Sequence, residues 1–458
     1  MGSSALSLSL PARVVIAGTH SGVGKTTVAT GLMAALRRAG HRVGAAKVGP
    51  DFIDPGYHSI AVGRPSRNLD MWMSGPNAVA PLAARAGAGV DLLVIEGVMG
   101  LFDGAGDGSP SSTADVARAL DAPVILVIDA SSMSQSVAAL VHGFATLDRQ
   151  VRVAGVILNR VGSPGHETLL RDALAPLGLP VFGVLMRDDR LVWRDRHLGL
   201  VPVAERGGEV AASIEVLAEM ITQRCDLAAI VRLASSAPLL AVADLAVPSI
   251  VAPSPLRIAV AAGPAFSFTY PDNLEALVSA GAELVPFDPC VDPALPSDVC
   301  GLVVGGGFPE VYASELSANA PLLADVRQRV TAGLVTWAEC GGLLWLCESL
   351  DGNAMAGVIA AKSTMSARLT LGYRTATTRT TTPLGPPGLS LRGHEFHYST
   401  TDPGGDLFEL VGRQGTGMGG FGDARLVASY LHTHLAARPD VTESFVLACA
   451  ALRLPYPR

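Results

Sequence analysis

Short apolar runs, each ending in a small or polar residue, recur along the first half of the chain. They lie at Val14–Gly18, Val43–Val48, Leu92–Glu96, Val124–Asp129 and Val153–Asn159. Segments with helical periodicity, such as Thr26–Arg38 and Ser132–Thr146, separate several of these runs. Buried strands that alternate with helices are typical of a parallel sheet with helices on both faces. We therefore predict an α/β domain of this kind in the first half.

The proline-rich stretch Ser235–Pro255 interrupts this alternation. After it, the pattern predicts a helix at Asp272–Gly281 and strands at Arg257–Ala262, Glu283–Phe287, Leu302–Gly305 and Leu334–Glu339. We place a domain boundary near residue 250. This gives two α/β domains, 1–250 and 251–458, each a mostly parallel sheet with helices on both faces. The chain shows no period of about 20–50 residues, so a repeat architecture is disfavoured.

Composition narrows the class of protein. The 458 residues are 49% hydrophobic and 16% charged, which is typical of a folded chain with room for two or three domains. The net charge of −7 argues against nucleic acid as a partner, because a polyanion repels a chain of the same sign. Six cysteines without a C-x-x-C pair indicate reduced thiols and a cytoplasmic location. The apolar N-terminus lacks a basic leader, and no stretch reaches about 18 uninterrupted apolar residues, so we expect neither export nor a membrane partner.

A glycine-rich loop, from Gly18 to Thr26, follows the first strand and opens a helix. In this context backbone N–H groups can bind phosphates, so we expect ATP as a cofactor. Lys25 would supply positive charge, and Lys47 would connect a phosphate to a substrate carboxylate. The loop has one residue more between its outer glycines than the strict motif G-x-x-x-x-G-K-[ST]. The nucleotide-binding residues predicted here are Gly22, Gly24, Lys25, Thr26, Thr27 and Lys47.

Four acidic residues, Asp51, Asp54, Glu96 and Asp103, are expected at the same edge of the sheet. Glu96 ends an apolar strand, where an acid faces the phosphate loop and can hold Mg²⁺. Mg²⁺ usually takes one or two protein carboxylates, so some of the four acids serve another purpose. Asp54 and Asp103 also precede proline and glycine, where acids commonly form turns. We predict Thr26, Asp54 and Glu96 as metal ligands, and the division of roles among the acids stays open.

The segment Leu334–Trp345 predicts a strand, a sharp turn and a helix, with Cys340 at the turn. This is the arrangement of a nucleophile elbow, and a helix N-terminus favours the thiolate of such a cysteine. Gly306 and Gly307 follow another predicted strand, and their N–H groups would suit an oxyanion. Either His432 or His434 could act as the base that takes the proton of the Cys340 thiol.

Two further segments permit a functional and a structural interpretation. Arg368 and Arg374 alternate with apolar residues, so they fit a solvated edge strand nearly as well as a site. His394 and His397 would point to opposite faces of a strand, and no third ligand is evident, so we predict no zinc there.

Together these motifs resemble a known family. The phosphate loop is similar to the dethiobiotin synthetase branch, and the segments Lys47–His58 and Ile95–Gly104 resemble the cobyrinic and hydrogenobyrinic acid a,c-diamide synthases. The resemblance covers nearly the whole chain. It implies that domain 1–250 is an ATP-dependent amidoligase in which Asp51 and Asp103 take part in substrate activation and Asn159 contacts adenine.

Domain 251–458 resembles the class I glutamine amidotransferases. Ala338 replaces the first glycine of their usual elbow, and the usual acid two residues after the catalytic histidine is missing. The corrin ligases also lack that acid, and their catalytic histidine corresponds to His432 rather than His434. The resemblance therefore implies a dyad of Cys340 and His432.

The resemblance also implies two half-reactions, with L-glutamine and a corrin polycarboxylic acid as substrates. Cys340 would release ammonia from glutamine, and ATP with Mg²⁺ would convert the a and c carboxylates into acyl phosphates that ammonia attacks. Six arginines are candidates to line a cleft for the polyacid, or else belong to the solvated surface: Arg64, Arg67, Arg187, Arg190, Arg194 and Arg196.

Several alternatives stay open at this point. The overall resemblance favours a metal-free corrin over a cobalt-containing one. A cobyric acid synthase would amidate other carboxylates of the same ring. A phosphate-loop regulatory ATPase with an inactive second domain is an alternative of another class, and a homodimer is one alternative for the oligomeric state.

Overall fold

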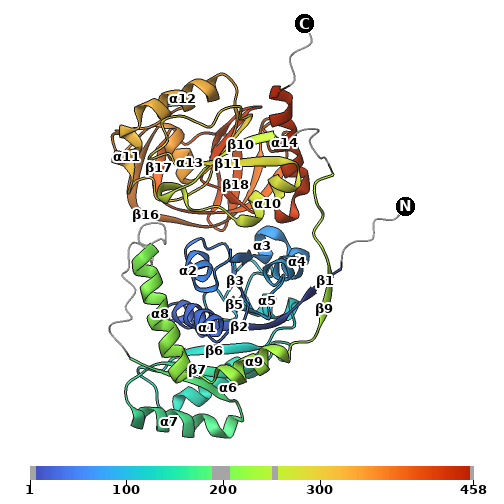
Figure 1. Cartoon of the computed structure of the whole chain (residues 1–458), viewed down its shortest axis with the longest axis vertical. Coiled ribbons are helices and arrows are strands. Elements are labelled where there is room, and N and C mark those ends of the chain that lie inside the picture. Colours follow the sequence, from blue (N-terminus) through green and yellow to red (C-terminus); the bar gives the residue numbers. More distant parts are fainter. Residues whose placement is uncertain (1–6, 188–206, 250–255, 454–458) are drawn as a thin grey trace, which may run out of the picture. The chain divides into compact units, whose positions relative to one another are not determined.

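The computed structural model describes residues 7–187, 207–249 and 256–453 of the chain. It divides into two compact units, Met1–Leu245 and Ala246–Arg458. Figure 1 shows helices and strands alternating along both units.

Seven parallel strands form the central sheet of the first unit in its described residues. Their spatial order is β4 (Arg67–Leu69), β3 (Val43–Val48), β5 (Leu92–Glu96), β2 (Ala12–Gly18), β6 (Val124–Asp129), β7 (Val153–Val161) and β8 (Val181–Met186). The five strands predicted for this half are all present. β2 lies in the middle with later strands on both sides, which is the position where α/β proteins bind ligands.

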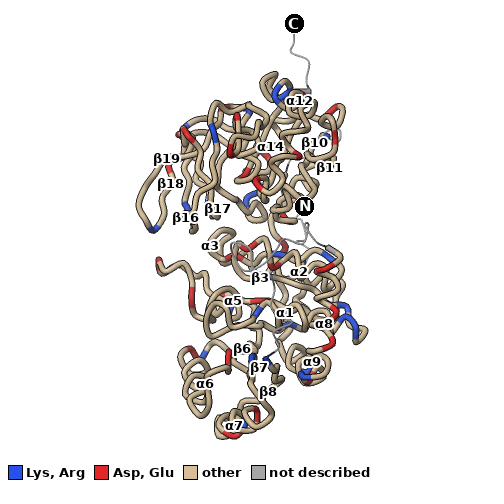
Figure 2. Tube along the Cα trace, turned by 90° about the vertical axis from the view of Figure 1, so that its left-hand side faces the viewer, with Lys and Arg blue, Asp and Glu red and all other residues tan. Residues whose placement is uncertain are grey.

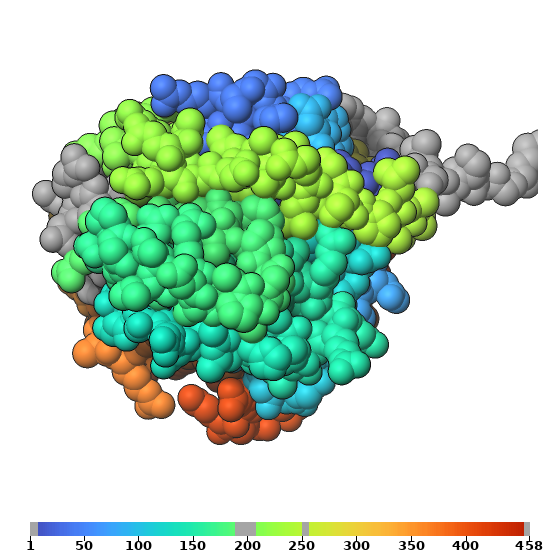
Figure 3. All heavy atoms as spheres, turned by 90° about the horizontal axis from the view of Figure 1, so that it is seen from below, coloured from blue at the N-terminus to red at the C-terminus, as the bar shows by residue number. Residues whose placement is uncertain are grey.

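Helices cover both faces of this sheet. On one face, α1 (Lys25–Arg38), α2 (Ile53–Val62), α8 (Gly207–Arg224) and α9 (Leu227–Ser235) share a core with Val14 and Ile16 of β2. α4 (Pro76–Ala86) packs on β3 and β4 and against α5 (Thr113–Ala119). The buried residues of α4 lie outside that core, so α4 and α5 cover the opposite face of the sheet. The unit also contains α3 (Met71–Ser74), α6 (Ser136–Thr146) and α7 (Pro164–Leu174). Figure 3 shows α6 to α9, in teal to yellow-green, packed side by side on one surface of the unit.

Two details of the first unit differ from the sequence-based expectations. The helix expected from Ser132 begins at Ser136, because residues 130–135 form turns before it. The proline-rich stretch contains a strand, β9 (Leu240–Ala243), which pairs antiparallel with β1 (Ser7–Leu10). This stretch therefore belongs partly to the first unit.

The described residues of the second unit form a six-stranded sheet. Its order is β11 (Ala282–Phe287), β10 (Leu256–Ala261), β12 (Gly301–Val304), β13 (Val335–Glu339), β21 (Leu426–Ser429) and β20 (Phe421–Gly422), and all neighbours except β20 and β21 are parallel. α10 (Pro271–Ser279) and α14 (Pro439–Arg453) share a core with Val303 and Trp337 on one face. On the other face, α11 (Ala313–Ala318), α12 (Ala320–Thr331) and α13 (Gly341–Leu346) share a core with Leu302 and Ala338.

A second, mostly antiparallel sheet in this unit was not expected from the sequence. Its order is β15 (Asn353–Ala354), β14 (Cys347–Leu350), β16 (Ile359–Thr378), β17 (Ser390–Asp402) and β22 (His432–Thr433); β18 (Phe408–Gly412) pairs with β16, and β19 (Gly415–Gly419) pairs with β18. Only β14 and β16 run parallel. β22 has two residues, and a strand that short carries no readable periodicity.

The predicted α/β class is confirmed in both units. Figure 2 shows Lys and Arg interspersed with Asp and Glu along the trace of each unit. Among the described residues, no helix is long and apolar enough to cross a membrane.

Candidate active sites

The phosphate loop of the first unit has the backbone that its glycines permit. Gly22 and Gly24 have φ angles of 83° and 93°, which are left-handed values that favour glycine. A Cβ on Gly24 would lie 2.3 Å from the Asn159 side-chain nitrogen. That nitrogen donates a hydrogen bond of 2.8 Å to the Val23 carbonyl. The structure thus brings Asn159 to the loop, where its amide fixes the loop backbone.

Lys25 and Thr26 begin α1, directly after the loop, and Thr27 follows them half-buried. The Lys25 ammonium donates to the carbonyl of His20 at 3.3 Å. Burial, together with the neighbouring Lys47 ammonium, lowers the pKa of Lys25 to about 8. A phosphate near this group would relieve both effects, because it would supply the missing counter-charge.

Lys47 lies at the centre of a buried cluster of charges. Its ammonium contacts Asp54 Oδ2 at 2.6 Å and Glu96 Oε1 at 2.9 Å, and it also donates to the Gly97 carbonyl. Burial alone would lower the pKa of Lys47, but attraction to Asp54 and Glu96 raises it above its ordinary value. Burial likewise acts to raise the pKa of Glu96, but Lys47 and His58 hold it well below its usual range.

Two more side chains hold Glu96 in place. The Thr26 hydroxyl donates to Glu96 Oε1 at 2.7 Å and lies 3.3 Å from Asp54 Oδ2. His58 Nε2 contacts Glu96 Oε2 at 2.7 Å, and both side chains are fully buried. Sequence reasoning did not assign a role to His58. Its burial beside an acid becomes evident only when α2 is packed on the sheet.

The donor set at this edge fits Mg²⁺. The oxygens of Thr26, Asp54 and Glu96 converge, and hard oxygen donors are the ligands that Mg²⁺ prefers. In the described part of the chain, no group of three or more His, Cys, Asp or Glu is arranged to hold a metal by itself. A shared site with phosphate oxygens is consistent with both observations.

The two remaining acids are held by backbone groups. Asp51 Oδ1 accepts the N–H of Ile53, and burial and the neighbouring Asp54 raise the pKa of Asp51 well above its usual range. Asp103 Oδ2 accepts the N–H of Gly100 and lies near enough to Lys25 to oppose, in part, the lowering of the pKa of that lysine by burial. All four predicted acids are therefore found around Lys25 and Lys47.

In the second unit, Cys340 stands at a sharp turn between β13 and α13. Its φ of 48° is unusual for a non-glycine residue, as in other nucleophile elbows. The Cys340 N–H donates to the Ser429 carbonyl at 2.7 Å, and only 6% of the residue is exposed. Ala338 fits without difficulty, because its side chain points into the core with α13.

The two candidate histidines lie in different surroundings. His432 hydrogen-bonds to the Cys340 side chain, and its Nδ1 lies 3.5 Å from Glu339 Oε2. Burial acts to lower the pKa of His432, but Cys340 and Glu339 raise it to about 9. His434 instead faces Asp272 at 3.7 Å and packs against the Tyr270 ring. The structure thus brings His432, and not His434, to the thiol.

The glycine turn lies beside the same thiol. A Cβ on Gly306 would lie 2.5 Å from His432 Cε1, and a Cβ on Gly341 would lie 3.1 Å from the Gly307 nitrogen. The Gly306 N–H already donates to the Phe268 carbonyl at 3.0 Å, so it is engaged away from the thiol. In this turn, the N–H of Gly307 remains suited to stabilise an oxyanion. The N–H of Gly341, directly after the nucleophile, is a second suitable donor.

Arg374 does not lie on a solvated edge strand. It pairs with Glu395 at 2.8 Å, and both side chains are largely buried. Glu395 lies on β17 beside His394, whose ring is 5.3 Å from that of His432. Arg368 is exposed, as the alternative interpretation had it. The sequence analysis did not single out Glu339 or Glu395. Glu339 could have been found, because an acid directly before the cysteine of a nucleophile elbow is unusual.

The arginines considered for a substrate cleft are only partly covered by the structure. Arg64 and Arg67 are half-buried, Arg187 is exposed, and Arg64 donates to the Ala88 carbonyl. The other three lie outside the described residues: Arg190, Arg194 and Arg196.

Comparison with known proteins agrees with these two sites. Residues 14–200 match the CobQ/CobB/MinD/ParA nucleotide binding domain, and residues 257–440 match the CobB/CobQ-like glutamine amidotransferase domain. The hydrogenobyrinate a,c-diamide synthase of Streptomyces coelicolor is 49% identical over 95% of this chain and 97% of its own length. The chain belongs to the a,c-diamide synthase family. The resemblance seen in the sequence is therefore confirmed.

Other members of the a,c-diamide synthase family are similar over the same extent. The hydrogenobyrinate a,c-diamide synthase of Thermobifida fusca is 46% identical over 96% of this chain and 97% of its own length. The cobyrinate a,c-diamide synthase of Syntrophotalea carbinolica is 43% identical over 95% of this chain and 98% of its own length. The family thus includes relatives named for either acid, and this chain spans nearly all of each.

Proposed function

We propose that this protein is an ATP- and glutamine-dependent ligase that converts the a and c carboxylates of a corrin polycarboxylic acid into amides, as a step of cobalamin biosynthesis. The observation that carries the proposal is the contact of Cys340 with His432 in the amidotransferase domain of a chain that also carries a phosphate loop. A regulatory ATPase would have no use for this pair.

In the second unit, the reaction releases ammonia. The Cys340 thiol gives its proton to His432, and the thiolate attacks the side-chain amide of glutamine. N–H groups of Gly307 and Gly341 stabilise the oxyanion. The C–N bond then breaks, the proton from His432 leaves with ammonia, and water hydrolyses the glutamyl thioester to glutamate.

In the first unit, the reaction activates a carboxylate. Hydroxide is a poor leaving group, so a carboxylate must be converted into an acyl phosphate before ammonia can displace phosphate. Lys25 and the loop N–H groups bind the transferred phosphoryl group, and Lys47 holds Asp54 and Glu96 in place beside it. Mg²⁺ would neutralise phosphate charge, and Thr26, Asp54 and Glu96 would hold it. Asp51 and Asp103 would orient the substrate, and Asn159 would contact adenine in addition to holding the loop.

Hydrogenobyrinic acid, the metal-free corrin, is the substrate we propose first. Five relatives named hydrogenobyrinate a,c-diamide synthase are 44–49% identical to this chain, whereas three named for cobyrinate are 41–43% identical. The cysteines in the described residues form no disulfide, which supports a reducing, cytoplasmic location.

The test is incubation with ATP, Mg²⁺, glutamine and a panel of metal-free and cobalt-containing corrinoid acids, followed by mass analysis of the products. We expect the masses of products in which first one and then two carboxyl groups of hydrogenobyrinic acid have become carboxamides. Cys340→Ser should abolish the reaction with glutamine and preserve it with ammonium salts, because the thiol serves only nitrogen release. Lys25→Ala should abolish synthesis with both nitrogen donors.

Two results would contradict the proposal. If no corrinoid acid of the panel were amidated with either nitrogen donor, the substrate class would be wrong. If Cys340→Ser lost activity equally with glutamine and with ammonium, the cysteine would not be the nucleophile of a separate glutaminase reaction.

A further inference from the structure

Glu339, the residue directly before Cys340, contacts two consecutive residues on another strand. Its Oε1 accepts the N–H of Thr433 at 3.0 Å and the hydroxyl of Thr433 at 2.8 Å. Its Oε2 lies 3.5 Å from Nδ1 of His432, which is an ion-pair distance slightly longer than a good hydrogen bond. Both carboxylate oxygens therefore face the segment that carries the base.

The two strands reach this position by separate routes. Glu339 ends β13, which pairs with β21 at Ser429, whereas His432 lies on β22 and pairs with His394 of β17. Glu339 thus connects the end of the parallel sheet with the edge of the antiparallel sheet. Asn273 of α10 holds the same segment from another side, because its amide bonds to the Thr433 carbonyl and the Leu435 N–H.

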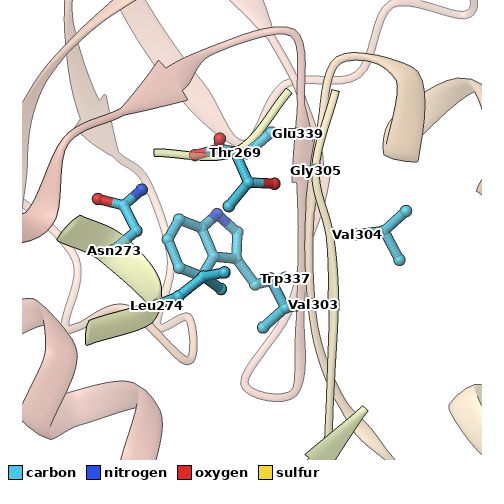
Figure 4. Close-up of a pocket in the computed structure, with 8 residues that line it drawn as sticks. All are labelled: Thr269, Asn273, Leu274, Val303, Val304, Gly305, Trp337 and Glu339. Carbon is cyan, nitrogen blue, oxygen red and sulfur yellow. The ribbon is translucent and has the colours of Figure 1, made fainter. Parts of the chain in front are cut away.

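A small pocket lies beside the carboxylate. Thr269, Asn273, Trp337 and Glu339 are among the side chains that line it. Figure 4 shows Thr269 and Glu339 close together at one end, next to the Trp337 indole nitrogen. Apart from Glu339, none of these side chains can carry a charge at neutral pH, so no cation in the pocket competes with His432 for the carboxylate.

Among the described residues, Glu339 is the acid at ion-pair distance from His432. The His394 ring lies 5.3 Å from the His432 ring, and the Arg374 guanidinium and His397 are close enough to act on His394. Glu395 also acts on His432 but is paired with Arg374. The side chains of His432 and Glu339 are 1% and 8% exposed, so water screens their attraction only weakly.

From this geometry we propose that Glu339 is the positioning acid of the glutaminase site. It holds the His432 ring with Nδ1–H toward the carboxylate and Nε2 toward the Cys340 thiol, and it stabilises the imidazolium that forms when the thiol proton moves to Nε2. Glu339 would thus take the part that an acid two residues after the histidine has in other amidotransferases. This inference rests on the proposed glutaminase reaction.

The test measures the Cys340 thiolate directly. Wild-type and Glu339→Gln proteins are alkylated with iodoacetamide across a pH series, and the rate at Cys340 is read from the mass of its peptide. Without the carboxylate, neutral thiol and neutral imidazole are favoured over the ion pair. We therefore expect the midpoint of alkylation to rise by about one unit and the rate at neutral pH to fall about tenfold. Glutaminase kcat should fall about 10- to 100-fold with KM little changed.

The matched control is Thr433→Val, which removes one hydrogen bond to Glu339 and keeps the charge and the shape. It should leave the alkylation midpoint in place. If Glu339→Gln does not fold, Glu339→Asp draws the carboxylate back from the ring by one methylene and should give an intermediate midpoint. An unchanged midpoint in either variant would overturn the inference. A raised midpoint in a protein that amidates no corrinoid acid would instead overturn the proposed substrate while preserving the role of Glu339.

Discussion

Lys47 offers the sharpest test of the electrostatics in the first unit. The substitution Lys47→Met keeps an unbranched side chain that is one atom shorter and removes its charge. Lys47 is only 3% exposed, and its ammonium lies 2.6 Å from Asp54 and 2.9 Å from Glu96. Met would leave two carboxyl groups buried side by side without the cation that both contact.

These contacts set the expected loss of stability in Lys47→Met. At an effective dielectric constant of about 20, each contact contributes about 6 kcal/mol of attraction, and desolvation of the ions offsets most of the total. Removing one partner of such a buried cluster typically costs about 3–5 kcal/mol. For a unit of this size, that loss lowers the melting temperature by about 6–20 °C, at about 2–4 °C per kcal/mol.

Differential scanning calorimetry of the full chain measures this effect with an internal reference. The transition of the first unit should move, and the transition of the second unit should stay in place. The double variant Lys47→Met, Glu96→Gln should be more stable than Lys47→Met alone, because one unpaired charge is gone. A shift below about 2 °C in Lys47→Met, or no recovery in the double variant, would refute the reasoning.

Three further predictions concern activity. ATP affinity should weaken as the pH rises through about 8, because the pKa of Lys25 is lowered to about 8 and only protonated Lys25 attracts phosphate. In a binding titration, Lys25→Arg should remove this pH dependence. His432→Asn should abolish glutamine-dependent but not ammonium-dependent synthesis, and His434→Asn should do less; the reverse order in the coupled assay would mean that the base is His434. Oxygen-18 placed in the substrate carboxylate should appear in inorganic phosphate, because a loop that binds β- and γ-phosphates favours γ-phosphoryl transfer; label in AMP would instead show adenylation.

Much of the local structure could be predicted from the sequence. The runs Val43–Val48, Leu92–Glu96 and Val124–Asp129 are strands with the bounds that the pattern gave. The loop before Lys25 and the turn at Cys340 are also where the sequence placed them, because glycine spacing and an apolar run fix the backbone within a few residues. Family resemblance then supplied the expected chemistry.

What each site residue touches was decided by tertiary structure. Lys47 was expected to meet phosphate, and it lies between Asp54 and Glu96, because β3 and β5 are neighbours in the sheet. Asn159 was expected at adenine, and in the structure its amide holds the phosphate loop at Val23. Neither contact follows from spacing along the chain.

Glu339 shows most clearly the difference between what the sequence determines and what only the tertiary structure determines. The sequence placed an acid before Cys340 and showed that the usual acid after His432 was missing, but nothing in it related the two. Glu339 and Thr433 are 94 residues apart, and they meet only because β13 ends beside the strand that carries His432. Local patterns in a sequence determine which backbone forms, since they act over a few residues. The partners of a buried charge depend on the order of strands in two sheets, and that order is fixed only when the whole core packs.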